Sequence, residues 1–94
     1  MDIDEILKKA FEAGASDVHL TVGEPPVIRL HGELDKLPGE PFTEEGLLET
    51  VKKSMHQRAQ DEFKKNWEAD FSYSVEGCAR FRVNVFRQNR GLSD

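Results

Sequence analysis

Residues 17–22, Asp17-Val18-His19-Leu20-Thr21-Val22, alternate strictly between polar and apolar side chains. Successive side chains of a β-strand point to opposite faces of the sheet. The three apolar residues would therefore face a core, and the three polar ones would lie on the other face. The stretch predicts a half-buried strand, and the segments around it indicate what kind of sheet it joins.

The segment before this strand carries apolar side chains at helical spacing, so we expect an amphipathic helix over residues 3–13. Asp2 can cap its start, and Gly14 suits the left-handed residue that often ends a helix. The apolar face of this helix would consist of Ile3, Ile6, Leu7, Ala10 and Phe11.

Two more strands are expected after the break at Gly23-Glu24-Pro25-Pro26. Residues 27–30 form the first of them. His31-Gly32 is typical of a turn into a third, short strand that runs through Leu34 and Leu37. Residues 38–41 contain two prolines and a glycine and predict a loop.

A helical apolar pattern returns after this loop. Thr43 can cap a helix whose first turn holds two glutamates, which favour the helix dipole. The apolar stripe of this helix would be Leu47, Leu48, Val51 and Met55. The spacing continues in Ala59, Phe63 and Trp67, which mark either a third helix or a continuation of the second.

The last part of the chain alternates again. Residues 71–75 and 80–86 predict two strands joined by a hairpin turn at Glu76-Gly77. On the second strand Arg80, Arg82 and Asn84 would share the exposed face, opposite the apolar face that belongs to the core. The order of helix, three strands, two helices and two strands predicts an α+β fold with a largely antiparallel sheet and helices packed on one face.

The composition allows a single domain and argues against several functions. With 94 residues and a net charge of −5, the chain is too short for two cores and too acidic for general nucleic-acid binding. One cysteine excludes an internal disulfide and a cysteine-rich zinc site. No apolar run approaches the ~18 residues of a membrane-spanning helix, and the acidic start is unlike a signal peptide. We therefore expect a cytoplasmic protein.

No motif of a catalytic or metal site is present. The two common glycine motifs for nucleotides are absent, and His19, His31 and His56 lack metal-ligand spacing. Cys78 has no activating partner in sequence. Residues 71–94 are the only positive region, with four arginines against two acidic residues. Arginine suits forked contacts with phosphate or carboxylate, but the charge alone favours a solvated strand edge that discourages aggregation. These patterns favour a non-catalytic module.

Two longer stretches are more specific. Residues 13–32, AGASDVHLTVGEPPVIRLHG, and residues 69–91, ADFSYSVEGCARFRVNVFRQNRG, resemble two signatures of the secretion and type IV pilus motor ATPases. The resemblance covers essentially the whole chain and is greatest for the retraction branch, which drives twitching motility.

The resemblance implies that residues 1–94 are a PAS-like N-terminal domain of a two-domain protein. The RecA-like ATPase domain, with its Walker motifs, is absent from this chain. The chain itself would then bind no cofactor and hydrolyse no ATP, whereas its parent would be an ATPase that uses ATP and Mg. Partners would be the chain's own ATPase domain, neighbouring subunits of a hexameric ring and an inner-membrane platform protein at the pilus base.

The resemblance also assigns site residues. Arg82 matches a family arginine that reaches nucleotide phosphates when the two domains close, and the simpler alternative is a surface ion pair. Arg29, Arg80, Asn84 and Gln88 would line the interdomain cleft or the ring interface. A further strand would pair beside residues 78–88, and its loss would leave a bare edge that promotes dimers or strand swapping.

Two alternatives remain at this point. One is the equivalent domain of a pilus-assembly or type II secretion ATPase. The other is a stand-alone PAS-like sensor or adaptor, which would need an internal cavity. Against the second, the aromatic residues predict a tightly packed core; they are Phe11, Phe63, Trp67, Phe71 and Phe81.

Overall fold

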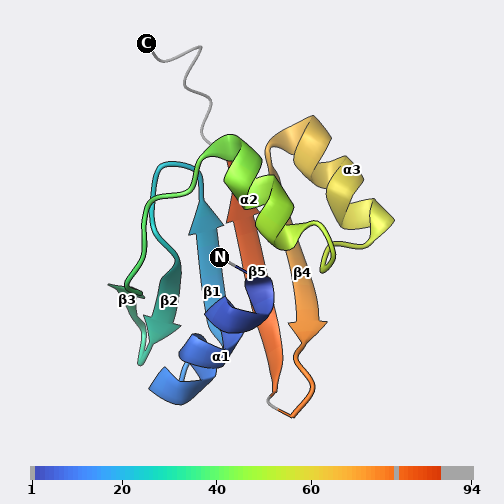
Figure 1. Cartoon of the computed structure of the whole chain (residues 1–94). Helices are drawn as coiled ribbons and strands as arrows, with labels where there is room; N and C mark the ends of the chain where they lie inside the picture. The colour runs from blue at the N-terminus through green and yellow to red at the C-terminus, as the bar shows by residue number, and fades with distance from the viewer. Residues whose placement is uncertain (1, 78, 88–94) are drawn as a thin grey trace.

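The computed structural model describes residues 2–77 and 79–87 as a five-stranded sheet with three helices (Figure 1). The elements in chain order are α1 (Ile3–Ala13), β1 (Asp17–Thr21), β2 (Val27–Leu30), β3 (Glu33–Lys36), α2 (Glu44–Val51), α3 (Gln57–Asn66), β4 (Glu68–Ser74) and β5 (Arg80–Phe86). This order and the α+β class confirm the prediction.

The strands lie in the order β3-β2-β1-β5-β4. The pairs β1–β2, β2–β3 and β4–β5 are antiparallel, and β1–β5 is parallel. The sheet is therefore largely antiparallel, as predicted, with one parallel pairing at its centre. Local patterns cannot reveal this pairing, because it joins the two ends of the chain.

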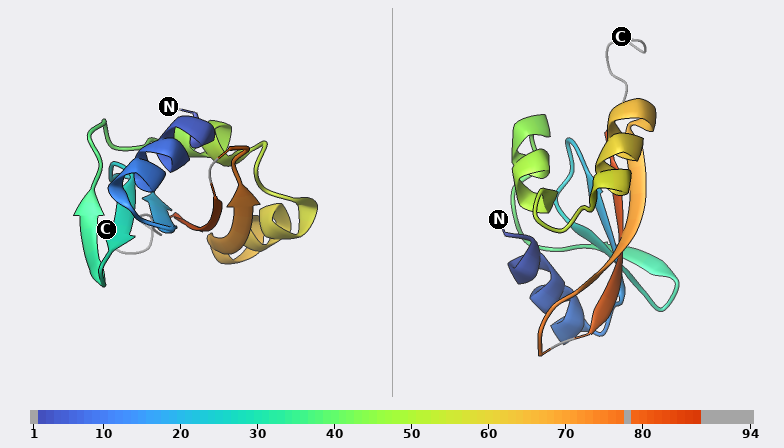
Figure 2. Two further views of the ribbon diagram at one scale, coloured as in Figure 1. Left: turned by 90° about the horizontal axis from the view of Figure 1, so that it is seen from below. Right: turned by 90° about the vertical axis from the view of Figure 1, so that its right-hand side faces the viewer.

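The core lies between the sheet and the helices. Figure 2 shows α1 and α2 over one face of the sheet, with α3 along β4 at one end. The fully buried apolar side chains from α1 and α2 include Ile3, Ile6, Leu7, Leu47 and Val51. They pack with the inward side chains of the strands, which include Val18, Leu20, Phe81, Val83 and Val85. The other face of the sheet carries the alternating polar residues.

Local signals explain most helix ends. Gly14 ends α1 in the left-handed conformation (φ 91°), where glycine has no Cβ to clash. The Thr43 hydroxyl accepts a hydrogen bond from the Gly46 N–H at 3.0 Å and caps α2. His56 caps α3 through Nδ1, which accepts from the Ala59 N–H at 3.2 Å. This second cap separates α3 from α2, so residues 57–66 form a third helix.

Three predictions about single side chains are wrong. Asp2 occupies the cap position of α1 but makes no side-chain cap bond, because its carboxylate pairs with Lys53 instead. Phe11 is 48% exposed, since it lies near the end of α1, where the chain turns away towards β1. Trp67 ends α3 with its backbone in the left-handed conformation (φ 62°). Its ring therefore does not continue the apolar stripe of the helix.

The prediction of a bare edge along residues 78–88 is also wrong. β5 lies between β1 and β4 and is paired on both sides. The outer strands of the described sheet are β3 and β4. The parallel β1–β5 pairing occupies the position that an additional strand was expected to fill, so the predicted dimerisation loses its structural basis.

Candidate functional site

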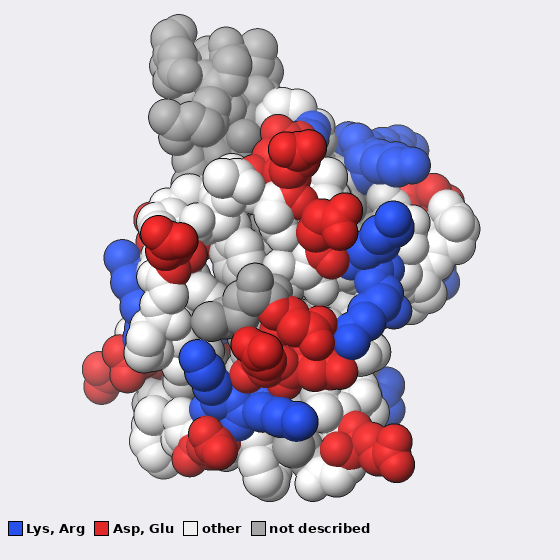
Figure 3. Space-filling view, viewed as in Figure 1, with Lys and Arg blue, Asp and Glu red and all other residues white. Residues whose placement is uncertain are grey.

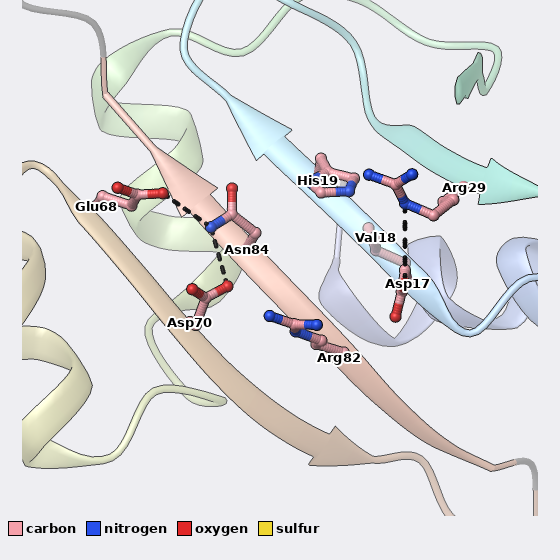
Figure 4. Close-up of a pocket in the computed structure, with 8 residues that line it drawn as sticks. All are labelled: Asp17, Val18, His19, Arg29, Glu68, Asp70, Arg82 and Asn84. Carbon is pink, nitrogen blue, oxygen red and sulfur yellow. Dashed lines mark hydrogen bonds and ion pairs between the residues drawn. The ribbon is translucent and has the colours of Figure 1, made fainter. Parts of the chain in front are cut away.

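The sheet face that α1 and α2 leave open contains a hollow of about 340 Å³ (Figure 4). Its lining comes from four strands and consists of Asp17, Val18, His19, Arg29, Glu68, Asp70, Arg82 and Asn84. Seven of these eight residues are polar or charged. They are brought together because strand alternation places them opposite the buried side chains of the same strands.

Strand register arranges the polar residues in rows. In the first row Asp17 of β1 lies opposite Arg29 of β2 on one side and Arg82 of β5 on the other. In the second row Asn84 of β5 lies between His19 of β1 and Asp70 of β4. Residues that are far apart in sequence thus become direct neighbours.

Each of the three carboxylates in the hollow has a polar partner. The Asp17 Oδ2 atom lies 3.9 Å from Nε of Arg29, in an ion pair between partly exposed side chains. The Asn84 Nδ2 group donates hydrogen bonds to Asp70 Oδ1 at 3.0 Å and to Glu68 Oε2 at 3.3 Å. Asn84 therefore holds both acidic residues of β4.

Arg82 stands apart from this network. It is exposed on β5, and Figure 4 shows its side chain between those of Asp70 and Asp17. Its guanidinium makes no hydrogen bond or ion pair with any residue in 2–77 or 79–87. Ser72, which lies directly opposite on β4, carries no charge. The hollow thus presents one arginine whose donors are available.

His19 is half-buried on the same face. Its Nε2 atom is shielded from solvent and has no hydrogen-bond partner among the described residues. The other two histidines lie elsewhere: His31 is exposed in the β2–β3 turn, and His56 caps α3. Within the described ranges no group of three or more His, Cys, Asp or Glu side chains is arranged to hold a metal ion.

The remaining predicted site residues are only partly brought together. Arg29 and Asn84 line the hollow with Arg82. Arg80 is exposed on the same face of β5, opposite Ser74, but lies outside the lining. Gln88 and Cys78 lie outside the described residues.

A second cluster, which sequence reasoning missed, surrounds the end of β5. Arg87 forms an ion pair with Glu44 in the first turn of α2. Its guanidinium carbon also lies 4.1 Å from the centroid of the Trp67 ring. The register of the β4–β5 hairpin could have revealed this cluster. Glu68 pairs with Phe86, so the next residues outward, Trp67 and Arg87, become neighbours.

A third cluster joins the start of α1 to β4. Lys53 Nζ lies 3.1 Å from Asp4 and 3.4 Å from Asp2, and the Tyr73 hydroxyl donates to Asp4 at 3.3 Å. The hydrogen bond to Asp4 raises the pKa of Lys53 above its usual value. Burial, followed by the Asp4 charge, raises the pKa of Tyr73.

On the helical side of the molecule, the described residues include both acidic and basic side chains. Figure 3 shows acidic and basic side chains intermingled over this side, unlike the continuous positive surface of a nucleic-acid binder. None of the helices within residues 2–77 and 79–87 is long and apolar enough to cross a membrane.

No family model matches the chain. The type IV pilus retraction ATPase PilT of Pseudomonas aeruginosa is 41% identical over 91 residues, which are 97% of this chain and 26% of that protein. The type IV pilus ATPase PilU of the same organism is 33% identical over 94% of this chain and 23% of its own length. A twitching motility protein of Neisseria gonorrhoeae is 40% identical over 70% of this chain and 18% of its own length.

A solved structure agrees with these relatives. The crystal structure of the pilus retraction motor PilT with bound ADP matches with a TM-score of 0.73 and 39% identity, over 95% of this chain and 26% of that one. The chain thus spans about a quarter or less of the length of the relatives it matches. It belongs to the PilT family of type IV pilus ATPases and corresponds to the N-terminal domain of PilT.

Proposed function

We propose that this chain is the N-terminal assembly and nucleotide-sensing domain of a motor ATPase that retracts type IV pili. The main support is its identity of 41% with a pilus retraction ATPase over 97% of the chain. The parent would hydrolyse ATP with Mg in a separate RecA-like domain. The described residues offer a guanidinium suited to phosphate rather than a set of metal ligands, so we assign the metal to that other domain.

The observation that carries the sensing role is the state of Arg82. Its guanidinium is exposed and unpaired within the described residues, while the three carboxylates of the hollow are engaged by other side chains. A guanidinium can bind phosphate oxygens through two parallel hydrogen bonds. When the two domains close, Arg82 would offset the charge of a nucleotide phosphate, so that nucleotide binding would be linked to the angle between the domains.

The same relatives support an assembly role. We propose that six parent chains form a ring, in which this domain packs on the ATPase domain of its neighbour, with Arg29, Arg80, Asn84 and Gln88 near the domain or ring interfaces. The ring would act on the platform protein from the cytoplasmic side of the inner membrane. The matched relatives named above are all pilus or twitching-motility proteins, which favours this function over a stand-alone sensor.

The test is substitution of Arg82 in the full-length parent. Arg82→Gln should lower nucleotide affinity and ATPase activity, and Arg82→Lys should recover part of the affinity because it retains the charge without the fork. Arg58→Gln, which removes an exposed arginine from α3, is the matched control. ATPase activity and nucleotide affinity that are unchanged in Arg82→Gln would overturn the sensing role.

A further inference from the structure

We propose that Asn84 is a positioning residue that keeps Arg82 available to an anionic ligand by holding the acidic side chains of β4 on its own amide. This inference rests on the proposed role of Arg82. Asn84 would not need to touch the ligand, because it would act through Asp70 and Glu68.

The register places Asn84 and Arg82 in competition for Asp70. Asp70 lies directly opposite Asn84, and Arg82 lies two residues before Asn84 on the same face of β5. Diagonal neighbours of this kind are within reach of long side chains. Figure 4 shows Asp70 on β4 beside Asn84 and Arg82, which are both on β5, with the hydrogen bond going to Asn84.

The second carboxylate strengthens this arrangement. Glu68 also accepts from the Asn84 amide, at 3.3 Å, so two negative side chains converge on one neutral group. Without that group, the two carboxylates would repel each other, and a nearby cation would be favoured as their partner. Arg82 is the lining cation nearest to them in the register, since Arg29 lies on β2, three strands away from β4, and pairs with Asp17.

Removal of the Asn84 amide should therefore convert Arg82 from an available donor into the partner of Asp70. An exposed ion pair changes an equilibrium constant by at most about a factor of five. We expect the affinity of the hollow for a phosphate anion to fall about two- to five-fold in Asn84→Ala. Neutralising Asp70 in the same chain should reverse the loss of affinity. The position on β4 diagonally opposite Arg82 then carries no carboxylate.

The experiment uses the 94-residue chain with its arginine Nε–Hε groups observed by NMR, titrated with inorganic triphosphate. The variants are wild type, Asn84→Ala, Asp70→Asn and the double variant Asn84→Ala/Asp70→Asn. Asn84→Val, which favours a strand but has no donor, replaces Asn84→Ala if that variant unfolds. Asn66→Ala at the exposed end of α3 is the control for loss of an asparagine.

If Asn84 has this role, we expect two reversible changes, one in the Arg82 resonance and one in the affinity for triphosphate. Before ligand is added, the Arg82 resonance should shift in Asn84→Ala and return in the double variant. On titration, the weaker binding of Asn84→Ala should be restored in the double variant. A purely structural role of Asn84 predicts that Asp70→Asn raises the affinity by the same factor with and without the Asn84 amide, whereas the proposal predicts a larger gain in the Asn84→Ala background. Equal gains in the two backgrounds would overturn the proposal.

Separate results would overturn the role of Asn84 and the role of Arg82. If Arg82 of the wild type does not respond to triphosphate, the role of Asn84 is overturned, whereas the sensing role of Arg82, which acts when the two domains of the parent close, is decided by Arg82→Gln in the full-length parent. If Arg82 responds saturably and equally in wild type and Asn84→Ala, the role of Arg82 stands and only the role of Asn84 is overturned.

Discussion

The Arg87 guanidinium lies over the Trp67 ring, 4.1 Å from its centroid, and the Arg87 backbone N–H donates to the Trp67 carbonyl at 2.8 Å. The same guanidinium pairs with Glu44. One side chain thus joins the end of α3, the start of α2 and the end of β5. The contact fixes the position at which the chain leaves the described sheet.

Arg87→Ala should lower the free energy of unfolding by about 1–2 kcal/mol, because it removes a cation–π contact and a partly exposed ion pair. Arg87→Lys should cost less, since the charge remains. Trp67 is the single tryptophan of the chain, so urea denaturation can be followed by its fluorescence. Arg58→Ala is the control, and an equal effect of the two alanine variants would contradict the prediction.

Thr43→Ala should destabilise the domain by about 1 kcal/mol, because the Gly46 N–H loses its capping acceptor. Thr43→Ser keeps a hydroxyl at the same place and should remain close to wild type. Thermal or urea unfolding measures both. A loss of stability as large in Thr43→Ser as in Thr43→Ala would show that the methyl group, rather than the cap, is responsible.

Stability should fall in alkaline solution. The pKa values of Lys53 and Tyr73 are both raised by folding, from ordinary values of 10.5 and 10.0. The folded state therefore holds these protons more tightly, and the stabilisation is complete below about pH 10 and lost as the pH rises through the raised pKa values. Unfolding measured from pH 8 to pH 12 should show this decline.

The double variant Lys53→Met/Tyr73→Phe provides the control for the alkaline effect. It retains much of the apolar volume but has no proton to lose at either position. Its stability should depend less on pH than that of the wild type over the same range. Equal slopes for the two proteins would show that other groups cause the decline.

Two phenylalanines should respond very differently to truncation. Phe81 is 1% exposed in the centre of the sheet, whereas Phe11 is 48% exposed on α1. Phe81→Ala should cost about 3–5 kcal/mol, as is typical for a buried aromatic residue, and Phe11→Ala should cost under about 1 kcal/mol. Urea midpoints compare the two, and similar losses would place Phe11 in the core.

The sequence predicts what depends on neighbouring residues. Alternation identified β1 and β5, and capping residues identified the C-terminal end of α1 and the start of α2. It could not predict the parallel pairing of β1 with β5, which depends on a contact between distant segments. The network of Asn84 with Asp70 and Glu68 was missed for the same reason, because cross-strand neighbours appear only when the register is known.

The exposure of Phe11 shows the limit of the helical pattern. Its spacing from Leu7 suits the buried stripe, yet the core beneath α1 ends before it is reached. A periodic pattern gives the direction of a side chain and does not reveal how far the opposing surface extends. Whether a residue near a helix end is buried therefore depends on tertiary packing.

The central position of β5 has a consequence for biosynthesis. Paired residues such as Asp17 and Arg82 come from opposite ends of the chain, and no ladder can join β1 to β4 until residues 80–86 are available. Non-local pairing of this kind slows folding. Until β5 has left the ribosome, the nascent chain therefore carries β1 with one backbone edge unpaired. The sheet is completed only after residues 80–86 have been synthesised.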